Sequence, residues 1–230
     1  MDKNTPLGSS SFSSKDGTVS RPLSTTSYAI LGLLAVRPWT PYELTKQMRF
    51  SLGRFWPRAE SKLYEEPKKL VRHGLATSTA ESSGQRHRTR YAITDEGRTA
   101  LRTWLATTPQ PPTLEAEPLL RVFLAEHGTR ADLVATLEAV RSWAAKKLVE
   151  DARIARDYRD AGGPFPARIA QVTLVGRFLS DFALMSHDWA DGALRAVAAW
   201  PKDIDRATAD RDALDVIIRR GEHLVDEATP

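Results

Sequence analysis

The sequence predicts a mainly α-helical protein in two parts with one small β-element. Apolar residues recur at helical spacing through most of the chain after residue 23. A single pair of strand-like stretches lies between residues 75 and 93, and the segment 108–113 is proline-rich and uncharged. Residues 1–22 are polar with no hydrophobic period, which predicts a disordered tail. We therefore expect a first domain at 23–107, a linker at 108–113 and an all-helical second domain at 114–230.

Three helices are expected at the start of the first domain. Ser24 and Thr40 are good capping residues before apolar stretches of helical period, and Pro41 suits the first position of the second helix. The third helix should run from about Arg58 to His73. Pro67 inside it removes one backbone donor, which predicts one bent helix rather than two.

A hairpin and a fourth helix complete the first domain. Residues 75–79 have strand composition, residues 81–87 form a polar loop, and residues 88–93 alternate like a second strand. Thr94 then caps a helix that has acidic residues in its first turn. Three helices, a hairpin with a basic tip and a closing helix are the layout of a winged helix-turn-helix with a two-stranded wing.

The second domain contains only helical signals, including two long helices. The expected helices cover residues 114–126, 130–161, 166–200 and 211–226. Helices of about 30 residues span about 45 Å, and a domain of this size cannot easily cover two such apolar stripes. We expect this domain to form a homodimer by packing against a second copy. The alternative is a monomeric bundle with folded-back helices.

Charge and motifs narrow the class of function. Residues 23–107 contain 14 Lys and Arg against 7 Asp and Glu, whereas residues 114–230 contain 16 against 20. This asymmetry favours a polyanionic partner for the first domain alone. The chain has no cysteine, no two histidines within five positions of each other, and no nucleotide-binding, nucleophile-elbow or zinc-protease motif. We expect no enzyme activity, catalytic residue, metal or cofactor.

The distribution of apolar residues bears on localisation. No apolar run approaches the roughly 20 residues that a membrane span needs, and the first 22 residues lack the apolar core of a secretory signal. We therefore expect a cytoplasmic protein without a membrane partner.

Duplex DNA is the polyanion that the first domain fits best. A recognition helix carries small polar or basic side chains on the turns that face the major groove, and Glu65 lies among them here. Lysines further along it and the hairpin tip would hold phosphates. The expected DNA-contacting residues are Tyr42, Lys46, Arg58, Ser61, Lys62, Tyr64, Lys68, Lys69, Gln85, Arg86, His87, Arg88 and Arg90. Because of Pro67, base contacts are expected on the first two turns of the helix. The alternative is a dimeric scaffold whose winged helix contacts protein instead of DNA.

At these residues the sequence resembles the PadR family of bacterial transcriptional regulators. The motifs that carry the resemblance are Tyr28-Ala29-Ile30-Leu31-Gly32-Leu33-Leu34, Thr40-Pro41-Tyr42-Glu43-Leu44, Ser61-Lys62-Leu63-Tyr64-Glu65-Glu66-Pro67-Lys68-Lys69-Leu70, Gly74-Leu75 and Arg90-Tyr91-Ala92-Ile93-Thr94-Asp95-Glu96-Gly97. The family usually has glycine where Pro41 stands. By helix layout, the second domain is similar to that of virulence-gene activators.

The resemblance implies a homodimeric repressor that binds a palindromic operator and is released by a small aromatic ligand. Aromatic residues of the second domain could line the cavity for such a ligand. The candidates are Trp143, Phe178, Phe182, Trp189 and Trp200. The alternative is that these aromatics are ordinary core residues at helical spacing.

Overall fold

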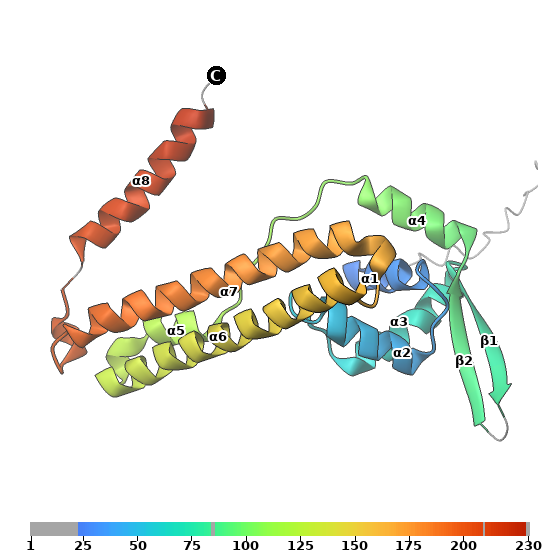
Figure 1. Cartoon of the computed structure of the whole chain (residues 1–230), viewed down its shortest axis with the longest axis horizontal. Helices are drawn as coiled ribbons and strands as arrows, with labels where there is room; N and C mark the ends of the chain where they lie inside the picture. Colours follow the sequence, from blue (N-terminus) through green and yellow to red (C-terminus); the bar gives the residue numbers. More distant parts are fainter. Residues whose placement is uncertain (1–22, 84–85, 209, 229–230) are drawn as a thin grey trace, which may run out of the picture. The chain divides into compact units, whose positions relative to one another are not determined.

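The computed structural model of the chain describes residues 23–83, 86–208 and 210–228. The expected disordered tail and Gln85 lie outside these residues. The chain divides between Pro111 and Pro112 into two compact units. Unit 1 holds the helices and the hairpin, and unit 2 holds only helices (Figure 1).

Unit 1 has the expected winged helix-turn-helix order. After α2 the backbone continues into one π-helical turn at Met48–Leu52. Strands β1 and β2 form an antiparallel hairpin that extends away from the helices α1 to α3 (Figure 1). The elements are α1 (Thr25–Leu34), α2 (Pro41–Gln47), α3 (Glu60–Arg72), β1 (Ala76–Ser83), β2 (Arg86–Ile93) and α4 (Asp95–Leu105).

The starts of three helices are determined by the capping residues that the sequence indicates. The hydroxyl of Ser24 accepts from the backbone N–H of Ser27, and that of Thr40 accepts from Glu43. The hydroxyl of Thr94 accepts from the N–H of Gly97 at 3.0 Å and so begins α4. Each cap satisfies a donor that the first turn of a helix leaves without a partner.

The core of unit 1 lies between α1, α2, α3 and the root of the hairpin. Its largest buried side chains are Ile30, Leu31, Leu34, Leu44, Met48, Leu63, Pro67 and Leu70. Trp39 joins this core to the sheet, because its backbone exchanges two hydrogen bonds with Tyr91 while its indole Nε1 donates to the carbonyl of Leu33 at 2.7 Å. The core therefore fixes both the rotation of α3 and the root of the hairpin.

Two expected boundaries in unit 1 were wrong. The strands run from Ala76 to Ser83 and from Arg86 to Ile93, so most of the predicted loop at 81–87 belongs to the ladder. Once the register is set, main-chain hydrogen bonds continue the pairing through polar residues that show no alternating pattern. The third helix begins at Glu60, two residues later than expected, and runs through Pro67 as one helix.

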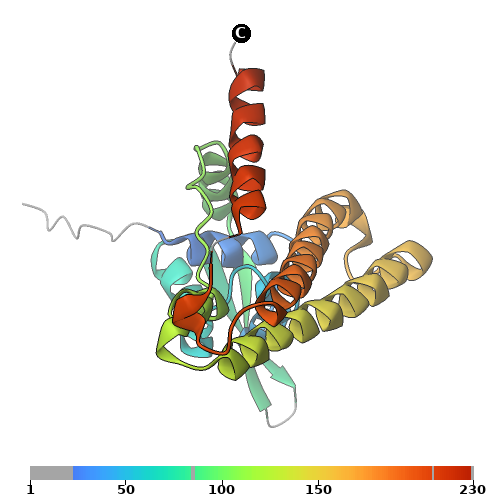
Figure 2. The ribbon, with the colours of Figure 1, turned by 90° about the vertical axis from the view of Figure 1, so that its left-hand side faces the viewer.

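Unit 2 consists of helices connected by short segments. The long helices α6 and α7 lie side by side in both views (Figures 1 and 2), and Gly162, with a φ of 75°, ends α6. The expected helix from residue 114 begins only at Glu117. The α-helices are α5 (Glu117–Phe123), α6 (Arg130–Ala161), α7 (Ile169–Ala198) and α8 (Arg211–Ala228), with 3-10 turns at Ala125–His127, Pro166–Arg168 and Ile204–Arg206.

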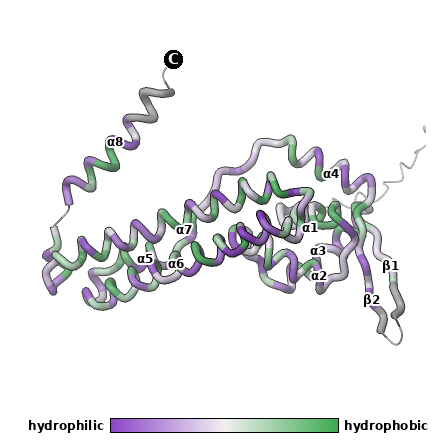
Figure 3. Tube along the Cα trace, in the orientation of Figure 1, coloured by the Kyte–Doolittle hydropathy of each residue, from purple (hydrophilic) through white to green (hydrophobic). Residues whose placement is uncertain are grey.

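Small residues allow α6 and α7 to pack closely. Ala144 of α6 and both Ala183 and Ala190 of α7 have no exposed surface. A second cluster, formed by Leu133, Leu137 and Val197, closes the end of the pair. Hydrophobic residues nevertheless recur along both helices (Figure 3), and the described side chains of α8, residues 211–222, are all exposed. Among the helices described, none combines the length and hydropathy of a bilayer-crossing segment.

Candidate nucleic-acid interface

One face of α3 is exposed and polar along its whole length. Its central line is Ser61, Glu65, Lys68 and Arg72, at steps of four, three and four residues, and all four side chains are exposed. The opposite face is buried in the core of unit 1. Lys62 and Tyr64 flank the line and are exposed, whereas Lys69 is half-buried. α3 therefore presents the side chains expected of a recognition helix.

Two carboxylates of α3 form ion pairs with nearby basic side chains. The Nζ of Lys68 lies 2.8 Å from the Oε1 of Glu65, and the hydrogen bond and charge of Lys68 lower the pKa of the Glu65 carboxyl. Arg49 of the π-helical turn lies 2.8 Å from Glu60. These ion pairs reduce the repulsion that two carboxylates would exert on a polyanion.

The first turn of α1 holds α3 in place through hydroxyl groups. The buried Ser27 hydroxyl donates to Oε2 of Glu66 at 2.6 Å. One residue earlier, Thr26 Oγ1 accepts from Nε1 of Trp56 at 3.3 Å, in the segment that leads into α3. One hydrogen bond is made to Glu66 within α3 and the other to Trp56 before it. Together they restrain both the position and the rotation of α3.

Arg58 does not lie on the recognition helix, contrary to expectation. Its guanidinium stands 4.1 Å above the ring of Trp56 and donates to the carbonyl of Pro57 at 2.7 Å. Ala59, with φ −61° and ψ 142°, is still extended. The loop carrying these contacts delays the start of the helix, so Arg58 stabilises the entry to α3.

The other expected contacts lie on α2 and the wing. The side chains of Tyr42 and Lys46 on α2 are exposed, the tyrosine by 69%. On β2, Arg88 is exposed, whereas Arg90 is half-buried and donates to the carbonyl of Pro38 at 3.5 Å. Arg86 and His87 are described as strand residues, and Gln85 lies outside the described part of the chain.

Arg72 is an exposed basic residue on α3 that was absent from the expected DNA-contacting residues. It lies four residues after Lys68 and on the same line. The spacing could have identified it, because residues four apart on a helix share a face. Arg72 extends the basic end of α3 by one turn.

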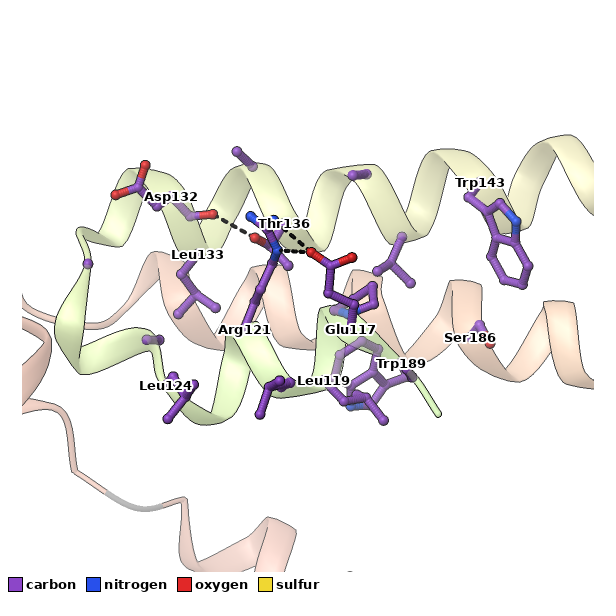
Figure 4. Close-up of a pocket in the computed structure, with 18 of the residues that line it drawn as sticks. Glu117, Leu119, Arg121, Leu124, Asp132, Leu133, Thr136, Trp143, Ser186 and Trp189 are labelled. Carbon is purple, nitrogen blue, oxygen red and sulfur yellow. Dashed lines mark hydrogen bonds and ion pairs between the residues drawn. The ribbon is translucent and has the colours of Figure 1, made fainter. Parts of the chain in front are cut away.

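Unit 2 contains a cavity of 1340 Å³ between α5, α6 and α7 (Figure 4). Trp143, Phe182 and Trp189 line it, and the rings of Trp143 and Phe182 meet edge to face with centroids 6.3 Å apart. Phe178 is not among the lining residues and is 66% exposed. Trp200 packs instead against the Leu133–Leu137–Val197 cluster. Three of the five aromatic candidates thus share one site.

Within the described residues, no group of three His, Asp or Glu side chains is placed to hold a metal ion.

The sequence of unit 1 matches a known family. Residues 30–103 match the model of the transcriptional regulator PadR-like family. Unit 1 is a PadR-like domain. A stretch of 98 residues is 35% identical to the negative transcriptional regulator PadR of Bacillus subtilis, covering 42% of this chain. That match spans 54% of the relative, about half of its length.

The fold likeness extends beyond the PadR-like domain. The structure of B. subtilis PadR in complex with operator DNA has a TM-score of 0.65 at 24% identity, and covers 76% of this chain and 99% of that one. The structure of the same protein in complex with p-coumaric acid has a TM-score of 0.59 at 24% identity, and covers 75% of this chain and 98% of that one. The structure of the Vibrio cholerae virulence activator AphA has a TM-score of 0.60 at 25% identity, and covers 76% of this chain and 99% of that one. These comparisons confirm the winged helix-turn-helix followed by long helices.

Proposed function

We propose that this chain is a sequence-specific DNA-binding regulator of the PadR type and acts as a homodimeric repressor in the cytoplasm. The observation that carries the proposal is the exposed polar line of α3, which the core of a PadR-like domain holds facing outward. In this proposal α3 enters the major groove, while Lys68, Lys69, Arg72 and the wing contact phosphates. No catalytic step is part of it.

The dimer is supported by apolar surface that unit 2 leaves uncovered. Leu174 and Phe178 of α7 are 73% and 66% exposed, and Val149 of α6 is 72% exposed. Apolar side chains of this size are stabilised when another surface removes them from water. A second copy that packs against α6 and α7 would supply that surface and carry a second winged helix to the operator.

An aromatic effector is supported by the cavity of unit 2. Trp143, Phe182 and Trp189 line the cavity, the rings of Trp143 and Phe182 meet edge to face, and aromatic walls suit an aromatic ligand. Its volume exceeds the roughly 300–1,000 Å³ of common small-molecule sites. A bound ligand would therefore fill only part of it.

A salt titration of DNA binding tests the proposal. Because phosphate contacts release counterions, the affinity for random duplex DNA should fall steeply as salt rises. Replacing both wing arginines (Arg86→Ala with Arg88→Ala) should weaken binding to every sequence and reduce the slope of log affinity against log salt by about 1 to 2. A mobility-shift assay measures both quantities.

A variant on α4 provides the control for the wing. Arg102→Ala removes one positive charge outside the proposed interface and should leave most of the slope intact. Absence of binding at low salt would favour the alternative, a dimeric scaffold that contacts protein. Binding with an unchanged slope in the wing variant would contradict the role of the wing.

A further inference from the structure

Glu65 occupies the middle of the exposed face of α3. It follows Ser61 by one turn and precedes Arg72 by two, and its side chain is 65% exposed. Leu63 and Leu70, on the opposite face, are at most 1% exposed. Because burial of these leucines fixes the rotation of α3, the helix cannot turn Glu65 away from whatever the face contacts.

A carboxylate at this position restricts the DNA that α3 can accept. Ionised glutamate only accepts hydrogen bonds, and it loses water when the helix enters the groove. In the major groove, guanine and thymine present acceptors, whereas only cytosine N4 and adenine N6 present donors. Opposite guanine or thymine, the carboxylate would lose hydration without gaining a base donor. An amino-bearing base therefore suits Glu65.

Cytosine suits the carboxylate better than adenine. Adenine presents the N7 acceptor beside its N6 amino group, so the second carboxylate oxygen would face a lone pair. Cytosine has a C–H group beside N4 and creates no such repulsion. An amide in place of the carboxylate would reverse the preference, because it can accept from N6 and donate to N7 of adenine.

Lys68 prepares Glu65 for this contact. Its Nζ donates to Oε1 of Glu65 at 2.8 Å, one helical turn away. The bond favours an orientation of the carboxylate toward Lys68 on the exposed face and offsets part of its repulsion from the phosphates. The other carboxylate oxygen, Oε2, remains available for a base.

We propose that Glu65 is a specificity-determining residue that accepts a hydrogen bond from the exocyclic amino group of a cytosine in each operator half-site. The inference rests on the proposed function, because it assumes that α3 lies in the major groove. It adds the chemical identity of one base and the residue that selects it.

Selection of bound sequences from a random DNA pool tests the inference with the full chain. The wild type should select cytosine at one symmetric position. Glu65→Gln should select adenine there, and competition titrations should show a preference for adenine over cytosine of about ten-fold. Because glutamine has nearly the size and shape of glutamate and the site is exposed, circular dichroism should show an unchanged fold.

Glu60→Gln is the charge-matched control. It removes one negative charge from the same helix. Glu60 is also in an ion pair, because the Nη1 of Arg49 lies 2.8 Å from its Oε1. Both variants should bind all DNA somewhat more tightly, but only Glu65→Gln should change the selected base. The same base preference in wild type and Glu65→Gln would overturn the inference while leaving the proposed function intact. Failure of the wild type to bind any duplex would overturn the proposed function, and this inference with it.

Discussion

Individual polar residues secure the helix starts on which the proposed DNA-binding surface depends. Glu43 accepts from the backbone N–H and the hydroxyl of Thr40, at 2.8 and 2.9 Å, and Arg37 lies 3.3 Å away. The backbone hydrogen bond from Thr40 is the main cause of the lowered pKa of the Glu43 carboxyl, with further lowering from the Thr40 hydroxyl and Arg37. The charged form of Glu43 is therefore favoured by folding.

The lowered pKa predicts a pH-dependent stability difference between wild type and Glu43→Gln. The glutamine can still accept from Thr40 but carries no charge. Since the folded-state pKa lies below its ordinary value, the charge stabilises the fold above pH 4.5 and ceases to do so as pH falls through the folded-state pKa. At pH 7 the free energy of unfolding of the wild type should exceed that of Glu43→Gln by roughly 0.5 kcal/mol, a small value because the Glu43–Arg37 pair is partly exposed.

Urea unfolding at pH 7 and pH 3 measures this difference. The gap between the two proteins should be smaller at pH 3 than at pH 7, because the stabilisation by the Glu43 charge is lost progressively below its ordinary pKa of 4.5. A gap of equal size at both values would mean that the charge of Glu43 is not what stabilises the start of α2.

At the scale of elements, α4 rests directly on the root of the hairpin. A Cβ at Gly97 would lie 2.1 Å from the carbonyl oxygen of Leu75 and 2.9 Å from the Ile93 side chain. The rings of Tyr28 and Trp104 stack with centroids 4.8 Å apart and join α4 to α1. The close approach of α4 to the strands therefore depends on the missing side chain of Gly97.

Gly97→Ala should destabilise unit 1 although alanine favours helices. The added methyl group meets a backbone carbonyl that can move only with β1, and such overpacking costs about 1–3 kcal/mol. Gly32→Ala is the matched control in α1, where a Cβ meets nothing within 4 Å. It should stabilise the protein by up to about 1 kcal/mol. Thermal unfolding compares the two variants, and an equal change in both would refute the packing explanation.

At the scale of the whole molecule, the exposed apolar side chains of α7 determine the assembly that we propose. Leu174, Phe178 and Met185 share one stripe at steps of four and seven, and they are 55–73% exposed. A second copy that packs against this stripe would bury these side chains. The proposed dimer also explains how two recognition helices could bind one palindrome.

Leu174→Arg combined with Phe178→Arg should convert the dimer to a monomer, because two charges would be buried without partners. Sedimentation equilibrium measures the association. The control is Arg177→Ala, which removes a side chain that is 82% exposed on the same turn. The charged variant should lose at least ten-fold in affinity for a two-half-site operator, but little for a single half-site. A dimer that survives the double substitution would place the interface elsewhere.

Local signals in the sequence predicted the helices well. The starts of α1, α2 and α4 follow from Ser24, Thr40 and Thr94, because a cap is a bond between residues three apart in the chain. The bounds of α6 were likewise predictable from Thr129 and Gly162. The sequence by itself thus determined the order of elements, the polar face of α3 and the resemblance to a family.

Tertiary contacts decided the rest. The start of α3 follows the loop in which Arg58 stacks on Trp56, and the length of the wing depends on strand pairing that continues into residues without an alternating pattern. Among the five aromatic candidates, helical spacing could not distinguish Trp143, at the cavity, from Trp200, in a separate cluster. A helical period identifies which residues share a face, but only packing determines what that face meets. For the same reason, the burial of Leu63 and Leu70 shows that Glu65 faces outward at the centre of α3, the proposed recognition helix.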